Sequence, residues 1–185
     1  MLRFASWDGE EYNLIGSTEY VEDNMESLRR DAFAYLNVDV GVSGPNFRAA
    51  ASPVFNKALR RVLARTSDPF LNETLQRLWD DRGGKLDGLG AGSDYVAFQD
   101  MAGTSSLDFG FNGPPFPYHS VYENFVWMDK FGDPGFQYHA VLAQVMALLI
   151  LEYAERPVMP FDISGYASGE YLTLQPSSMI KTGWY

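Results

Sequence analysis

Cysteine is absent from the 185-residue sequence, and histidine is scarce. Without cysteine the chain can form neither disulfides nor thiolate metal sites, so any metal must bind through carboxylate and imidazole groups. The redox compartment cannot be read from cysteine usage. The two histidines, His119 and His139, are the only imidazoles that a site in this chain could use.

Basic residues are also few: the sequence has 14 lysines and arginines against 24 aspartates and glutamates. The net charge of -10 and the pI of about 4.5 exclude nucleic acid as a partner, since nucleic acid requires a basic face, and argue against anionic membrane surfaces. An acidic composition is compatible with a metal pocket but does not require one, because acidic surfaces also serve solubility.

Long apolar runs are missing as well. The most apolar stretch, residues 140–151, contains Gln144 and is too short to span a bilayer, so we expect a core helix and no membrane segment in this chain. No signal peptide is visible at the N-terminus. With 46% hydrophobic and 15% aromatic residues, the length suits one domain with a sizeable core.

The opening stretch, residues 2–16, combines an apolar run with a dense group of acids. The run up to Trp7 predicts a buried strand, and Asp8, Glu10 and Glu11 follow it around one glycine. Carboxylates packed this closely repel unless a cation or a proton sits among them. The loop after a strand's carboxyl end is where open α/β sheets usually bind ligands. An acidic, solvated turn would also produce this pattern.

A second carboxylate follows a second predicted strand. Residues 16–30 predict a helix, and the apolar residues 32–38 predict a buried strand that ends at Asp39. A strand–helix–strand unit makes the two strands parallel, so Asp39 should lie at the same sheet edge as the acids of the opening loop.

The remaining elements complete an α/β pattern. We expect a small-residue loop over 40–51, helices over 52–64, 68–79, 93–101 and 133–155, and a strand over 104–109. The glycines of residues 88–93 do not match a dinucleotide loop, because the third glycine is misplaced and no strand precedes them. His139 lies in an apolar helix and is expected to have a structural role, whereas His119, beside Tyr118 in a loop after a strand, is the better ligand candidate.

Four short motifs, in this order and spacing, carry a family resemblance: residues 7–11 (WDGEE), 37–39 (NVD), 89–95 (LGAGSDY) and 118–122 (YHSVY). Together with residues 130–134 and 159–162, they make the chain similar to the M28 zinc peptidases, in the branch of glutamate carboxypeptidase II and the transferrin receptor. The resemblance implies a three-layer zinc-exopeptidase-like α/β fold with a mostly parallel central sheet flanked by helices, incomplete at both ends. Residues 1–162 would be a partial peptidase domain and residues 163–185 a divergent tail.

The same resemblance implies a two-zinc site and a peptide substrate. Glu10 corresponds to the general base that takes a proton from the attacking water, and Tyr118 to the hydroxyl that steadies the oxyanion. Glu11 and His119 correspond to ligands of one zinc and Asp39 to a ligand of the other. A general base beside two zinc ions is a coherent way to hydrolyse a peptide bond.

The resemblance places Ser93 and Asp94 on a loop that borders the substrate pocket. Arg48 is the remaining basic counterpart of arginines that glutamate-selecting members carry where this chain has Asp108 and Gly110. No glutamate-releasing specificity is therefore assigned.

Some family parts are not found in this chain. The family's upstream histidine and bridging aspartate precede the tract at residues 7–11, and a helical dimerisation domain follows the peptidase domain. We therefore expect an incomplete metal site, an inactive fragment of a zinc-dependent exopeptidase, and a homodimer for the full-length protein. The family also suggests membrane anchoring or a secretory or vacuolar location through an upstream segment. The alternative is a non-catalytic, transferrin-receptor-like scaffold or interaction module.

Overall fold

The computed structural model describes residues 1–167 and has a three-stranded sheet with strand order β1-β3-β2. The central strand β3 (Ser105–Asn112) pairs in parallel with β1 (Ala34–Asn37) and antiparallel with β2 (Asn46–Ala51). The expected α/β class is confirmed, but the sheet of the described residues is mixed. Of the tail predicted at 163–185, residues 168–185 lie outside the described residues.

The second strand replaces most of the loop that was expected over residues 40–51. Along β2, burial alternates, so that Phe47, Ala49 and Ala51 point into the core. Alanine has little intrinsic preference for strands, which is why the local sequence favoured a loop. Pairing of all of β2 with residues 107–112 of β3 overrides that preference.

The expected strand over residues 2–7 is wrong. Leu2 and Phe4 are 52% and 81% exposed, and none of the described residues pairs with this segment in a ladder. A strand is stable only when a neighbour satisfies its backbone groups. The segment is held by Trp7 instead, whose indole N–H donates to the Tyr35 hydroxyl at 2.9 Å and whose ring contacts Tyr20.

Helices account for most of the remaining chain. Their bounds are α1 Ile15–Asp23, α2 Met25–Asp31, α3 Asn56–Leu63, α4 Leu75–Asp81, α5 Tyr95–Asp100, α6 Phe125–Trp127, α7 Gln137–Ala154 and α8 Ser164–Ala167, with short 3-10 turns at Glu10–Tyr12, Pro53–Phe55 and Pro134–Phe136 and a π turn at Met128–Gly132. The helices predicted over 52–64 and 133–155 are confirmed, and α5 lies within the helix predicted over 93–101.

Two predicted helices differ from the structure. The helix expected over 16–30 is broken at Asn24, whose side chain donates to the Tyr20 carbonyl and so competes with the backbone pattern. The helix expected from residue 68 begins at Leu75. Asp68 accepts hydrogen bonds from the backbone N–H groups of Phe70 and Leu71, which makes a turn, and Thr74 caps α4 instead.

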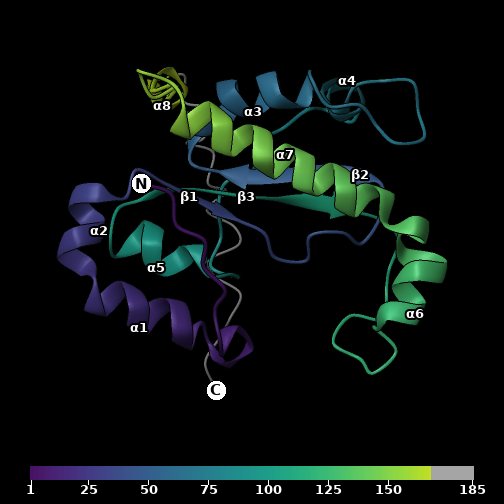
Figure 1. The fold of residues 1–185 in the computed structure, drawn as a ribbon, viewed down its shortest axis with the longest axis horizontal. Helices are drawn as coiled ribbons and strands as arrows, with labels where there is room; N and C mark the ends of the chain where they lie inside the picture. The colour runs from purple at the N-terminus through teal and green to yellow at the C-terminus, as the bar shows by residue number, and fades with distance from the viewer. Residues whose placement is uncertain (168–185) are drawn as a thin grey trace.

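Helices cover both faces of the sheet (Figure 1). α3, α4 and α7 lie on one face, where Leu107, Phe109 and Phe111 of β3 are fully buried. α1, α2 and α5 lie on the other, where Phe98 stacks on Tyr35 at 4.2 Å between ring centroids. Because side chains alternate along a strand, β3 gives its apolar residues to the first face and polar ones, including Asp108, to the second.

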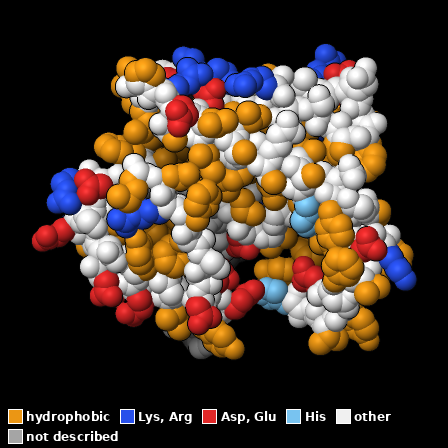
Figure 2. All heavy atoms as spheres, viewed as in Figure 1, with side chains coloured by type: hydrophobic (Ala, Val, Ile, Leu, Met, Phe, Trp, Pro, Cys, Tyr) orange, Lys and Arg blue, Asp and Glu red, His pale blue; other side chains and the backbone are white. Residues whose placement is uncertain are grey.

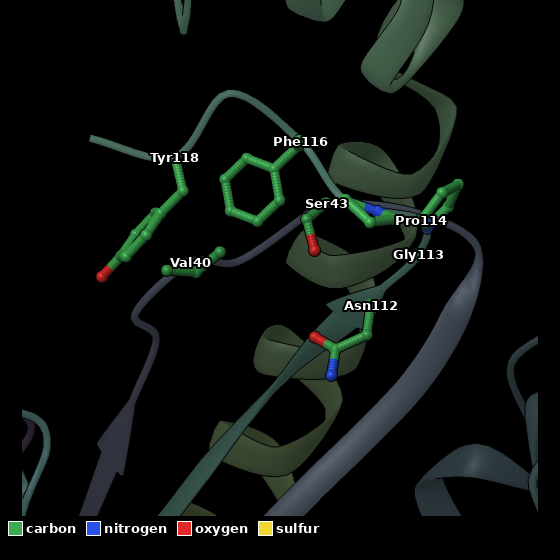
Figure 3. Close-up of a pocket in the computed structure, with 8 residues that line it drawn as sticks. Val40, Ser43, Asn112, Gly113, Pro114, Phe116 and Tyr118 are labelled. Carbon is green, nitrogen blue, oxygen red and sulfur yellow. The ribbon is translucent and has the colours of Figure 1, made fainter. Parts of the chain in front are cut away.

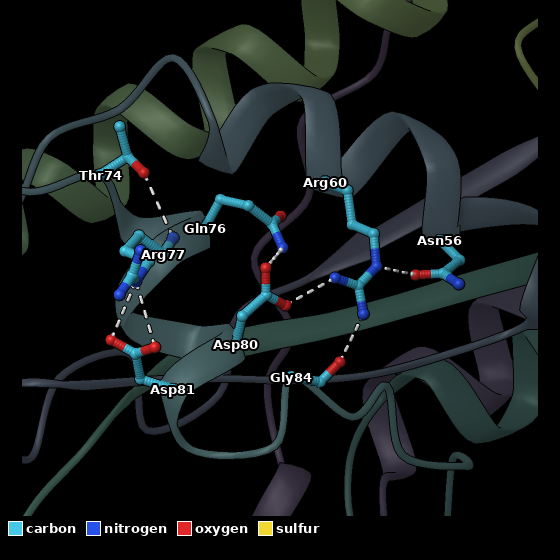
Figure 4. Close-up of polar contacts among 8 residues, drawn as sticks. All are labelled: Asn56, Arg60, Thr74, Gln76, Arg77, Asp80, Asp81 and Gly84. Atoms are coloured by element: carbon cyan, nitrogen blue, oxygen red, sulfur yellow. Dashed lines mark hydrogen bonds and ion pairs between the residues drawn. The ribbon is translucent and has the colours of Figure 1, made fainter.

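The interface between α3 and α4 depends on one arginine (Figure 4). Arg60 bonds Asn56, Asp80 and the Gly84 carbonyl, and its guanidinium lies 5.0 Å from the centre of the Trp79 ring. A single side chain thus ties the end of α4 and the following turn to α3.

Residues Pro134–Ala154 form the one helical stretch within residues 1–167 that is long and apolar enough to cross a membrane, by length and composition alone. Its inner side belongs to the core through Val141, Val145 and Leu149, as expected of a core helix. The structural role predicted for His139 is confirmed, because its Nδ1 lies 2.7 Å from the buried carboxylate of Asp133.

Truncation of the central strand tests this packing. Phe109→Ala should lower the free energy of unfolding by about 3–5 kcal/mol, because it leaves a cavity under α3 and α7. Phe131→Ala, at a side chain that is 72% exposed, is the matched control and should change it by less than about 0.5 kcal/mol. Urea unfolding curves measure both, and similar losses in the two variants would contradict the assigned core.

Candidate active site

The acidic loop is built from a run of left-handed residues. Gly9, Asn13 and Leu14 have φ values of 68°, 74° and 60°, so the chain turns tightly around Glu10 and Glu11. Gly16 closes the loop, because a Cβ there would lie 2.4 Å from the Asp8 carbonyl oxygen. The two glutamates therefore sit on a short, conformationally constrained turn rather than after a strand.

Asp39 lies on a second constrained turn, directly after β1. The next residue, Val40, has a φ of 45°, which is unusual for a β-branched residue and costs backbone strain. The Nη2 of Arg48 donates to the Asp39 carbonyl at 2.7 Å and holds this turn against β2.

The loop after β3 supplies Tyr118 and His119. Their rings stack at 3.8 Å, and His119 has a φ of 56°. The backbone N–H of His119 donates to the Glu123 carboxylate, and its Nε2 lies 2.6 Å from Glu11 Oε1. The contact joins two loops that are far apart in the sequence. In the space-filling view, acidic side chains and a histidine border a hollow in the lower half of this face (Figure 2).

Several neighbouring charges act on Glu10. Burial raises the pKa of Glu10, the charges of Asp39, Glu11 and Asp94 raise it further, and His119 lowers it. The acidic loop does not follow a strand, so the expected alignment with Asp39 at one sheet edge is wrong, although the charge of Asp39 does act on Glu10. A glutamate with a raised pKa among other carboxylates has the character of a general base.

Tyr118 is influenced by the same charges. Removal from solvent raises the pKa of its hydroxyl, and Glu11, Asp39 and Glu10 raise it further. The hydroxyl therefore stays protonated at neutral pH and remains a hydrogen-bond donor.

The remaining predicted substrate residues take part in a buried polar network. Asn37 Nδ2 donates to Ser93 Oγ at 3.0 Å and to Asp108 Oδ1 at 2.9 Å, and Arg48 Nη1 lies 2.5 Å from Asp108 Oδ2. The roles of Asn37 and Asp108 were not predicted. Asn37 lies two residues before Asp39, and the polar Asp108 interrupts an apolar strand, so both carried a signal in the sequence.

Asp94 is the other buried residue of this loop, with 9% exposure. Its Oδ1 is buried and has no hydrogen-bond partner among the described residues. A buried carboxylate oxygen without a partner is costly, and it leaves one negative atom close enough to act on Glu10.

The residues fit zinc in their chemistry, because carboxylate oxygen and imidazole nitrogen are zinc ligands. Glu11 and His119 are in direct contact, so an ion that bridged them would have to part these two side chains slightly. Both are at least half exposed and free to do so. Within residues 1–167, no three acidic or histidine side chains are arranged to hold a metal ion.

The raised pKa of Glu10 predicts that the folded, metal-free chain loses stability as the pH rises. The folded state binds the proton of Glu10 more tightly than the unfolded state, so stability falls as the pH rises above its ordinary pKa of 4.5. With a chelator present, Glu10→Gln should raise Tm near pH 7 and have no effect near pH 4. Glu22→Gln, on the exposed side of α1, is the control. Equal changes in Tm for Glu10→Gln at pH 7 and at pH 4 would contradict the raised pKa of Glu10.

The family model described as Peptidase family M28 matches residues 1–132. The chain is 42% identical over 170 residues to a probable glutamate carboxypeptidase of Arabidopsis thaliana, covering 88% of this chain and 24% of that protein. It is 32% identical over 184 residues to an aminopeptidase of Mus musculus, covering 89% and 25%.

A third relative is an inactive zinc metalloprotease of Schizosaccharomyces pombe, which is 34% identical over 172 residues, covering 90% of this chain and 21% of that protein. The chain spans about a quarter of the length of the curated relatives it matches. From the family match and these relatives, the chain belongs to peptidase family M28, in its glutamate carboxypeptidase-like branch.

Proposed function

We propose that the protein is a zinc-dependent exopeptidase that hydrolyses a peptide bond next to a chain terminus through a two-zinc site. The observation that carries this proposal is the convergence of three separate loops. His119 of the third loop contacts Glu11 of the first, and the charges of Glu11, of His119 and of Asp39 from the second loop all act on the pKa of Glu10.

In this proposal Glu11 and His119 hold one zinc and Asp39 holds the other. Bound zinc lowers the pKa of water from about 15.7 towards 7 and so supplies a nucleophile at neutral pH. Three ligands do not satisfy two ions that each require four or five, so the whole protein must supply more. We propose that residues 1–162 are part of a larger three-layer domain with a mostly parallel sheet, which also dimerises.

The chain's own residues supply the proton transfers. Glu10 accepts a proton from the attacking water, which its raised pKa favours, and passes it to the nitrogen of the leaving group. The Tyr118 hydroxyl, held protonated, donates a hydrogen bond to the carbonyl oxygen as negative charge develops there.

A non-catalytic role is the second candidate. The observation that favours it is the lack of three metal-binding side chains arranged together among residues 1–167, and a relative of this chain is named inactive. In that case the fold would serve as a scaffold or interaction module.

Replacement of the general base separates catalysis from metal binding. With zinc bound, Glu10→Gln should lower kcat for dipeptide hydrolysis by about 10²–10⁴-fold, because the base is lost while the metal ligands remain. Glu26→Gln on α2 is the matched control. Zinc content measured in both proteins should be equal, and unchanged hydrolysis by Glu10→Gln would overturn the role of Glu10.

Replacement of the histidine tests the metal site directly. His119→Gln should weaken zinc binding by at least about tenfold, because an imidazole ligand is lost. His139→Gln keeps a hydrogen bond to Asp133 and should bind zinc like the unmodified chain. Metal analysis after dialysis against buffered zinc measures both. Stoichiometric zinc in His119→Gln would exclude this histidine as a ligand, and no zinc in any variant of the whole protein, which supplies the further ligands, would favour the scaffold.

A further inference from the structure

We propose that the cavity beside Tyr118 binds an uncharged, apolar side chain of the peptide substrate, and that Asp108 enforces this selectivity by neutralising Arg48. The inference rests on the proposed function, since it names the substrate class of that same site. It is carried by the shape and charge of the cavity rather than by the zinc ligands.

The cavity lies next to the candidate catalytic residues and has a volume of about 480 Å³. Small-molecule pockets have volumes of about 300–1,000 Å³, so a side chain and part of a backbone can enter. Figure 3 shows Val40, Phe116 and Tyr118 on one part of its wall and Asn112 and Pro114 on another. Because Tyr118 belongs to both the site and the cavity, a residue bound here would adjoin the scissile bond.

None of the residues that line the cavity carries a charge. Aromatic, proline and valine side chains provide apolar contact area, and the polar members are a serine and an asparagine. Apolar surface is buried favourably in such a site, whereas a carboxylate would lose its hydration without gaining a partner.

Each nitrogen of the Arg48 guanidinium behind this wall already donates one hydrogen bond. Arg48 Nε donates to Asn112 Oδ1 at 3.0 Å, Nη1 pairs with Asp108, and Nη2 donates to the Asp39 carbonyl. The side chains of Arg48 and Asp108 are 29% and 10% exposed, so solvent and salt screen this ion pair only partly. Asp108 therefore compensates the charge that Arg48 would otherwise present to an acidic ligand.

A carboxylate next to the wall acts in the same way. Asp39 immediately precedes the lining residue Val40, so its negative charge disfavours an acidic side chain nearby. Arg48 also shapes the wall, because its bond to the Asp39 carbonyl holds the turn on which Val40 has a φ of 45°.

Two matched probes test the selectivity on the full chain without metal. N-acetylphenylalaninamide and N-acetylglutamylamide share a neutral backbone and differ in the side chain. Titrations followed by the backbone amide NMR signals of Asn112, Gly113 and Phe116 should give at least tenfold tighter binding for the phenylalanine probe. Equal or tighter binding of the glutamyl probe would overturn the proposal, and so would the absence of any shift at these three residues.

Substitution of the neutralising carboxylate tests the cause. Asp108→Asn keeps the shape and one acceptor but leaves the charge of Arg48 uncompensated. The glutamyl probe should then bind at least fivefold more tightly than it binds the unmodified chain, so that the preference for the phenylalanine probe becomes smaller. Asp81→Asn removes the same charge from the exposed end of α4 and should leave the preference unchanged. An unaltered preference in Asp108→Asn would overturn the role of Asp108.

A second variant keeps the test decisive if Asp108→Asn does not fold. Arg48→Gln removes the cation and leaves Asp108 unpaired, so N-acetyllysinamide should bind more tightly than to the unmodified chain. If it does not, the cavity does not sense this ion pair. The probe titrations require neither zinc nor hydrolysis. If the exopeptidase proposal fails, the failure will therefore appear in zinc content and turnover, and the selectivity measured with the probes will be unaffected.

Discussion

A buried carboxylate in the middle of the sheet ties the three strands together. Asp108 on β3 accepts from Asn37 on β1 and pairs with Arg48 on β2. Removing one partner of such a group leaves a buried charge without compensation. The resulting loss of stability is much larger than the stabilisation that the intact pair contributes. Because Arg48 also holds the Asp39 carbonyl, the same interaction sets the register of the sheet and the position of a candidate zinc ligand.

The candidate site is built on turns that the backbone would not adopt readily on its own. Leu14, Val40 and His119 all have positive φ, and each lies beside or within a segment that carries a predicted site residue. Strain of this kind persists only where surrounding contacts impose it, and it is common at functional sites. Val40 packs closely against β3, since a Cβ at Gly110 would lie 3.1 Å from its carbonyl oxygen, and Arg48 of β2 binds the carbonyl of the residue before it.

The sequence predicted elements whose signal is local. Proline at the start of a helix located α3 and α7, and an apolar run that ends in an acid located β1. The segments it missed depend on distant partners. β2 is rich in alanine and becomes a strand only against β3, and residues 2–7 had a strand pattern but have no neighbour among the described residues. Asn24 and Asp68 changed helix bounds through side-chain bonds that spacing rules do not capture.

For the site, the roles that the family resemblance assigns stay predictions, while the reasoning from two parallel strands is wrong, because residues 2–7 do not form a strand. The burial of Ser93 and the full engagement of Arg48 could not be foreseen, because both depend on Asn37 and Asp108 meeting across the sheet.

The contact between Glu11 and His119 has a consequence for the order of folding. The two side chains meet at 2.6 Å although more than 100 residues separate them in the sequence, so closing this contact requires ordering much of the chain between them. The local helices α1 and α2 can form early, but they bring no imidazole to the acidic loop. An ion that needs both donors can therefore bind only after β3 has docked and the loop that follows it has closed. Ion binding would then follow the folding of this part of the chain and would not initiate it.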